Sequence, residues 1–164
     1  MKMKTLSDLL VHELKDLYSA EKQLTKALPK MVKAATNEDL KQALQAHLEE
    51  TERQVERLDE IFGELELSNG RAPKCKAMEG LVEEGKSILE EEMEDDVRDA
   101  AIIAAAQRVE HYEIAGYGCA RTFAQQLGHD HVAALLQETL DEEKAADVKL
   151  TEIAVQTVNE EAEV

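Results

Sequence analysis

Aromatic residues and prolines are scarce in this 164-residue sequence, which has 3% aromatic residues, two prolines and no tryptophan. The core must then consist mostly of leucine, alanine, valine and isoleucine, a composition typical of helical proteins. No apolar run approaches the ~20 residues of a membrane span. The first residues lead directly into an amphipathic pattern rather than a secretory segment. We therefore expect a cytoplasmic protein that does not insert into a membrane.

Cysteine and positive charge are also limited. The two cysteines, Cys75 and Cys119, form no Cys-x-x-Cys motif of the kind that binds metals, so reduced thiols are expected. Lysine and arginine number 19 against 36 aspartates and glutamates, and the net charge is -17. Electrostatic repulsion therefore argues against nucleic acid and acidic membrane surfaces as partners.

Apolar residues recur at spacings of three and four along four long segments, a pattern typical of amphipathic helices. We predict one domain (residues 1–164) with helices at about 5–35, 38–67, 94–127 and 131–158. A turn at 68–73 opens a crossover of about 69–93, which contains a short extra helix. Two helical hairpins joined by a long crossover predict an all-α, ferritin-like four-helix bundle. The acidic tail from Asn159 is expected to fray.

All four apolar stripes become polar near their midpoints. Burying an ionised carboxylate costs several kcal/mol unless it is paired or metal-bound, so these positions call for a functional explanation. The midpoints of bundle helices meet at one level, and the side chains are therefore predicted to converge. The polar positions are Glu21; His47, Glu50, Thr51 and Gln54; Glu110 and Glu113; Glu143 and Asp147.

Such a set of carboxylates suits oxygen-preferring metals, and we predict two iron or manganese ions. The di-iron bundle pattern combines a glutamate from each of two helices with a Glu-x-x-His from each of the other two. Here Arg53 and Ala146 occupy the positions where those histidines would stand. Gln54 and Asp147 are the nearest substitutes, while His47 fits a hydrogen-bonded role better than ligation.

Glu142 and Glu143 compete for the place of the carboxylate on the fourth helix. An offset of 92 residues aligns Glu50 with Glu142 and Glu21 with Glu113, and this modest internal repeat favours Glu142. The helical stripe favours Glu143. Because a ligand must face the interior, we predict that Glu143 belongs to the site.

Several blocks of the sequence resemble the YciF-like bacterial stress protein family, and together they cover nearly the whole chain. The blocks are LYSAEKQL at 17–24, ALPKM at 27–31, HLEET at 47–51, EHYEIAGY at 110–117 and TLDEE at 139–143. The resemblance implies a ferritin-like bundle related to the rubrerythrins, a homodimer, a dinuclear metal site and an association with stress responses.

Carried over from the rubrerythrin-type site, the resemblance also implies a ligand set. The sequence departs from that site by lacking both ligand histidines, and it has no rubredoxin-like cysteine domain. The implied ligands are Glu21, Glu50, Glu110, Glu113 and Glu143, with Asp147 where a histidine would be expected.

Two functions are consistent with these features. The first is a metalloprotein of stress defence whose dinuclear centre reacts with dioxygen or peroxide. The alternative is a non-enzymatic dimeric bundle, or a partner-binding stress protein, with a degenerate metal site. In that case Lys22, Arg53 or Arg108 is expected to neutralise the carboxylates.

Overall fold

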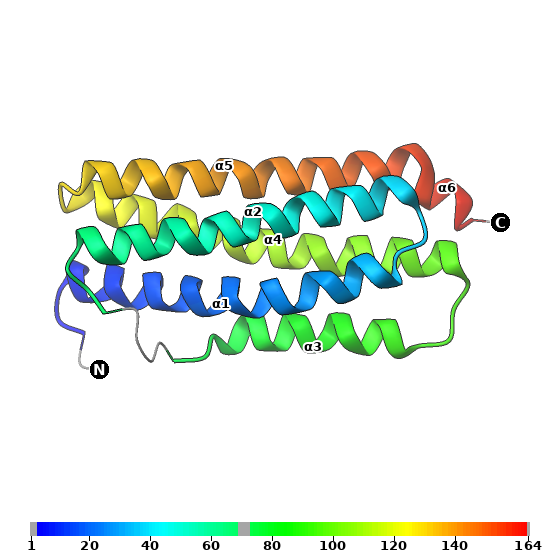
Figure 1. The fold of residues 1–164 in the computed structure, drawn as a ribbon, viewed down its shortest axis with the longest axis horizontal. Coiled ribbons are helices and arrows are strands. Elements are labelled where there is room, and N and C mark those ends of the chain that lie inside the picture. The colour runs from blue at the N-terminus through cyan, green and yellow to red at the C-terminus, as the bar shows by residue number, and fades with distance from the viewer. Residues whose placement is uncertain (1–2, 69–72, 164) are drawn as a thin grey trace.

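The computed structural model describes residues 3–68 and 73–163, and all regular secondary structure in these residues is helical. Four long helices lie side by side (Figure 1): α1 (Leu6–Ala34), α2 (Glu38–Glu64), α4 (Asp95–Gln126) and α5 (Asp130–Ile153). In the crossover from α2 to α4, α3 (Lys76–Glu90) packs against α1 and α4. This arrangement confirms the predicted all-α bundle with a short helix in the crossover.

The boundaries of the helices follow from local capping. The hydroxyl of Thr5 accepts a hydrogen bond from the backbone of Asp8, whose carboxylate accepts one from the backbone of Thr5. Asn37 caps α2 by accepting from the Leu40 N–H at 3.1 Å. These side chains satisfy backbone donors that a helix leaves free at its start. After α4, Gly128 adopts a φ of 78°, a left-handed conformation that favours glycine.

Two helix ends differ from the prediction. α2 ends at Glu64 rather than near residue 67, because Glu66 adopts a φ of 52° that a right-handed helix does not include. The tail does not fray at Asn159: a π-helical segment, η1 (Ala154–Val158), leads into α6 (Asn159–Glu161). Burial of Val158 in the apolar core explains this order. The predicted turn at residues 69–72 lies outside the described residues.

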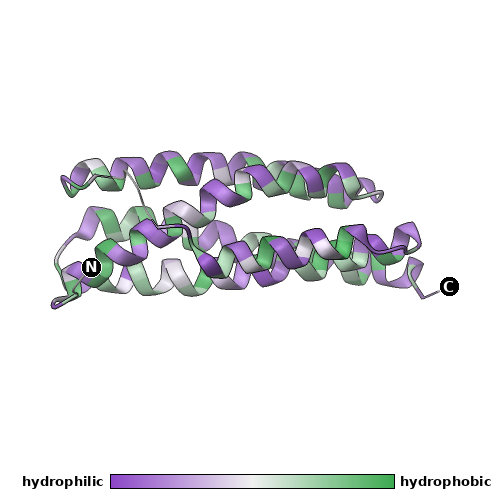
Figure 2. Cartoon of the chain, turned by 90° about the horizontal axis from the view of Figure 1, so that it is seen from below, coloured by the Kyte–Doolittle hydropathy of each residue, from purple (hydrophilic) through white to green (hydrophobic). Residues whose placement is uncertain are grey.

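The apolar side chains form two separate cores along the bundle. On α1, Leu24 belongs to one core and Leu17 to the other; on α2 the corresponding residues are Leu44 and Leu58. Figure 2 shows hydrophobic and hydrophilic residues alternating along the helices. Across the described residues, no helix combines the length and apolar composition that a membrane crossing needs. The polar positions predicted at the helix midpoints lie between the two cores.

Asp99 on α4 forms hydrogen bonds to the connection between α1 and α2. Its buried carboxylate accepts hydrogen bonds from the backbone N–H groups of Thr36 at 2.9 Å and Asn37 at 2.7 Å, and from the Thr36 hydroxyl at 2.6 Å. These bonds fix the height of the α1–α2 hairpin relative to α4. The alignment of the polar residues on those helices depends on this height.

We predict that Asp99→Ala lowers the free energy of unfolding by about 2–4 kcal/mol, because it leaves two backbone donors without their charged acceptor. Urea denaturation followed by circular dichroism measures the change. The exposed Asp96 on the same helix provides the control, and Asp96→Ala should cost less than about 0.5 kcal/mol. Equal effects of the two substitutions would contradict the assigned role of Asp99.

Candidate metal centre

Four glutamates and one histidine meet in the polar layer between the two cores. Glu21 comes from α1, Glu110 and Glu113 from α4, and Glu143 from α5, and each is at most 1% exposed. His47 comes from α2 and is 6% exposed. Ligand atoms of His47 and three of the glutamates, one atom from each, lie within 4.8 Å of one another. We call Glu21, His47, Glu110, Glu113 and Glu143 the buried group.

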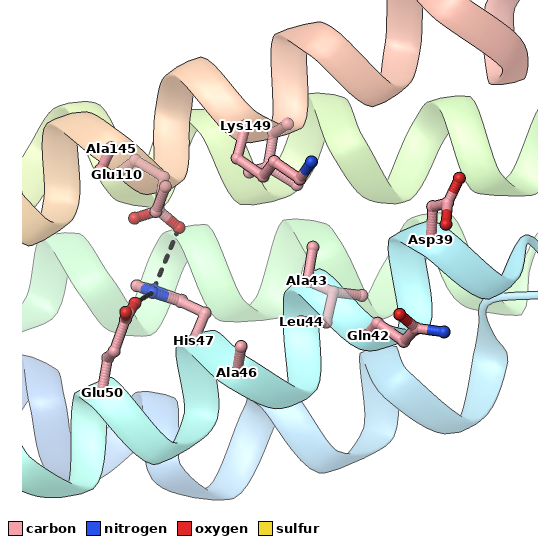
Figure 3. A pocket seen from close by; sticks show the side chains of 12 residues that line it. Asp39, Gln42, Ala43, Leu44, Ala46, His47, Glu50, Glu110, Ala145 and Lys149 are labelled. Atoms are coloured by element: carbon pink, nitrogen blue, oxygen red, sulfur yellow. Dashed lines mark ion pairs between the residues drawn. The ribbon is translucent and has the colours of Figure 1, made fainter.

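His47 contacts carboxylates on both sides of its ring (Figure 3). Nε2 lies 3.3 Å from Oε1 of Glu110 and 3.8 Å from Oε2 of Glu143, while Nδ1 lies 3.5 Å from Oε2 of Glu50. Neither ring nitrogen has a hydrogen-bond partner among the described residues. The preference for a hydrogen-bonded role of His47 over ligation stays a prediction. The sequence already places His47 on the inner face of α2, three residues before Glu50.

Neutral donors satisfy only part of the buried group. The Tyr117 hydroxyl donates to Oε1 of Glu21 at 2.5 Å, and Gln54 Nε2 donates to Oε1 of Glu143 at 2.5 Å. Thr51 instead donates to the backbone carbonyl of His47 at 2.9 Å, so its hydroxyl bonds within α2 and not to a carboxylate. Tyr117 and Gln54 therefore orient two of the four carboxylates, and Thr51 orients none.

Several buried carboxylate oxygens have no hydrogen-bond partner in the part of the chain that the structure describes. Such oxygens are rare in proteins, since an unsatisfied buried carboxylate costs several kcal/mol. Each therefore needs a proton, an unseen water or a cation. The oxygens are Oε2 of Glu21, Oε2 of Glu110, both oxygens of Glu113, and Oε2 of Glu143.

Without bound cations, the environment of the buried group favours the protonated forms of Glu21, Glu110 and Glu113. Burial raises the pKa of Glu21, Glu110 and Glu113 well above the ordinary 4.5, and the negative charge of neighbouring carboxylates raises it further. For His47, burial lowers the pKa, but the adjacent carboxylates of Glu50 and Glu143 outweigh burial, and the net shift is upward. The site therefore attracts positive charge strongly.

Two of the predicted ligands lie outside the buried group. The side chain of Glu50 is 33% exposed and contacts His47 from the solvent side. Oδ1 of Asp147 lies 3.3 Å from Nε2 of the exposed His111 and accepts from Gln107 at 3.2 Å. Asp147 stands four residues after Glu143, about 40° further around the α5 axis, and its carboxylate contacts α4 rather than the buried group. Metal ligation by either residue stays a prediction.

Arg57 is a charged contributor that sequence reasoning missed. It binds both oxygens of Glu142 at 2.9 and 3.0 Å and Glu138 at 2.6 Å, so Glu142 faces an arginine while Glu143 faces the interior. Glu143 therefore meets the condition of facing the interior, and its ligation of a metal stays a prediction. The expected neutralising cations are exposed, and in the described residues none forms an ion pair with the buried group; these are Lys22, Arg53 and Arg108.

A cavity of about 390 Å³ opens beside the buried group, between α2 and α5. His47 and Glu110 lie at its inner end, and Glu50 lies along its wall. The layer of carboxylates is therefore shielded by apolar cores along the bundle axis but is approachable from one side.

The fold and the site define a class of protein: a four-helix bundle with a crossover helix and a buried, carboxylate-rich layer at mid-height. Residues 5–163 match the family described as Domain of unknown function (DUF892), and the chain belongs to this family. Protein YciF from Escherichia coli (strain K12) is 54% identical over 163 residues, which cover 99% of this chain and 98% of that protein. The expected family relationship is confirmed.

Solved structures agree with this placement. The crystal structure of the E. coli stress protein YciF has a TM-score of 0.91 at 56% identity, covering 96% of this chain and 99% of that chain. YcfI from Rhodopseudomonas palustris has a TM-score of 0.85 at 50% identity, covering 92% and 95%. A protein from Xanthomonas campestris pv. campestris, 23% identical with a TM-score of 0.74 over 97% and 99% of the two chains, shares the fold.

We predict that the metal-free protein loses stability as the pH rises above 4.5, the ordinary carboxyl value. The raised pKa values of Glu21, Glu110 and Glu113 mean that the folded state binds more protons than the unfolded state. Their stabilising contribution is complete below 4.5 and is lost as the pH rises through the folded-state values. For each extra proton that the folded state binds, the free energy of unfolding falls by about 1.4 kcal/mol per unit rise in pH.

Urea denaturation in a chelator between pH 4.5 and 8 measures this slope. Glu113→Gln should flatten it, because the neutral amide cannot ionise, whereas the exposed control Glu49→Gln should not. A stability that rises over this range, or identical slopes for both variants, would contradict the prediction.

Proposed function

We propose that the buried group binds two divalent iron or manganese ions. The observation that carries this proposal is the set of five buried carboxylate oxygens without a hydrogen-bond partner among the described residues. A coordinated cation satisfies such oxygens and offsets their mutual repulsion at the same time. Protons satisfy the oxygens too, but only one per carboxyl group and only below its pKa.

Charge balance supports two ions rather than one. The four glutamates carry four negative charges when ionised, which equals the charge of two divalent cations. Gln54 and Tyr117 are neutral donors, and Arg57 is engaged with Glu138 and Glu142 outside the buried group. One divalent ion would leave two buried charges without compensation, a costly arrangement.

The donor atoms fit iron and manganese. Carboxylate oxygens with one imidazole suit these metals, whereas softer ions prefer thiolates. Both cysteines are free thiols outside the group. His47, Glu110, Glu113 and Glu143 would hold one ion. Glu21, with the remaining oxygens of Glu113 and Glu143, would hold the second.

We extend the proposal to a role in stress defence, since the 54% identical relative from E. coli is described as a stress protein. Bound iron or manganese would supply redox chemistry towards dioxygen or peroxide. The two apolar cores shield the buried group along the bundle axis. Tyr117 holds a proton at Oε1 of Glu21, and Gln54 fixes the orientation of Glu143.

A second candidate function is a non-enzymatic structural bundle. One observation favours it: a single histidine lies in the buried group, and Asp147 is directed to His111 rather than to the interior. In this case Glu21, Glu110 and Glu113, whose pKa values are raised, keep protons instead of binding metal ions. Metal analysis separates the two candidates.

We predict about two metal ions per chain after loading with Fe²⁺ or Mn²⁺ and removal of excess metal. Glu113→Gln should reduce this to one or fewer, because both Glu113 oxygens face the site, while Glu49→Gln should retain both ions. Metal at one hundred times its dissociation constant should add about 2.7 kcal/mol per bound ion to the stability of the unmodified protein. Elemental analysis and thermal melting provide the two measurements.

The structural candidate predicts the opposite results. The unmodified protein would then bind no Fe²⁺ or Mn²⁺, and its melting temperature would not respond to either metal. The homodimer implied by the family resemblance stays a prediction as well, and sedimentation equilibrium of the full chain measures it directly.

A further inference from the structure

We propose that cations reach the buried group through the cavity between α2 and α5, and that Glu50 is a transfer residue on this route rather than a final ligand. The inference rests on the proposed function and concerns how the site is filled. It reassigns Glu50, which the family resemblance places among the ligands.

The first support is the geometry of the cavity. Residues of α2 from Asp39 to Glu50 form one wall, and residues of α5 from Ala145 to Leu150 form the other. Two members of the buried group, His47 and Glu110, lie at its inner end (Figure 3). Both are more than nine-tenths buried, and both carry ligand atoms without a hydrogen-bond partner in the described residues. The cavity therefore ends at atoms that can accept a cation.

The second support is the size of the side chains along the route. Ala43, Ala46, Ala145 and Ala146 line the cavity, so short side chains from both helices keep the space between α2 and α5 open. The volume of about 390 Å³ far exceeds the ~15 Å³ that one water needs. A cation can therefore enter with part of its hydration shell and exchange water for carboxylate oxygens one at a time.

The third support is the charge of the lining residues. Asp39 lies at one end of the cavity in Figure 3, and Glu50, His47 and Glu110 lie together at the other end. Lys149 is the one lysine among the lining residues, and its positive charge partly offsets the negative charges of these three carboxylates. A cleft lined mainly by one sign of charge concentrates and steers the opposite ion.

The position of Glu50 distinguishes transfer from ligation. Its side chain is 33% exposed, whereas the four glutamates of the buried group are at most 1% exposed. Its Oε2 lies 3.5 Å from Nδ1 of His47, on the opposite side of the ring from Glu110 and Glu143. Glu50 therefore both lines the cavity and contacts His47, the most exposed member of the buried group.

Rapid mixing of the metal-free protein with Mn²⁺ and a fluorescent Mn²⁺ indicator tests this route. Glu50→Gln should slow uptake about tenfold, since it removes one steering charge next to His47. The bound metal at equilibrium should stay at two ions per chain, as in the unmodified protein. The matched control is Glu49→Gln, which makes the same charge change on the exposed side of α2 and should leave the rate unaltered.

Two further variants probe the same path from α5. Lys149→Gln should accelerate uptake about threefold by removing the opposing charge, and the exposed Lys144 provides its control. Ala145→Leu should slow uptake by narrowing the cavity, whereas Ala115→Leu on the exposed face of α4 should not. Circular dichroism and melting temperatures establish that each variant is folded.

The outcomes separate the route from the site. If Glu50→Gln lowers the equilibrium stoichiometry, Glu50 is a ligand and the inference is overturned. If all the cavity variants load at the control rates with two ions bound, the route lies elsewhere while the proposed function stands. If the unmodified protein binds no Mn²⁺ at any time, the proposed function fails together with the route.

Discussion

The burial of four glutamates in one layer is the constraint on which the rest of this structure depends. Their desolvation and mutual repulsion oppose folding, so the surrounding structure must hold them together. Two apolar cores, one on each side of the layer, supply that stabilisation. Asp99 sets the height of the α1–α2 hairpin relative to α4, and Tyr117 and Gln54 orient individual carboxylates.

Much of the fold and the centre of the site could be predicted from the sequence, because helical periodicity is a local property. The spacing of apolar residues along each helix indicates which residues face the interior. A charged residue on that face shows the height along the bundle at which a polar site is expected. Glu21, Glu110, Glu113 and Glu143 were identified in this way, and the structure places all four in the interior. The same logic preferred Glu143 over Glu142; Glu143 is buried and Glu142 pairs with Arg57, and ligation by Glu143 stays a prediction.

What could not be predicted depends on how helices face one another. Arg57 on α2 pairs with Glu142 on α5. The rotation of these two helices relative to each other cannot be predicted from the sequence of either helix. The same rotation places His47 against Glu110 and turns Asp147 towards His111. The cavity follows from several small residues on two helices, a feature that only their juxtaposition reveals.

The buried group draws on α1, α2, α4 and α5, and this has a consequence for biosynthesis. A chain emerging from the ribosome presents Glu21 and His47 early, but Glu143 only when α5 is made. The layer cannot close around its ligands until the last long helix has docked, because N-terminal segments are synthesised and begin to fold first. A chain truncated before α5 therefore exposes isolated carboxylates, and the layer forms only after α5 has been synthesised and has docked.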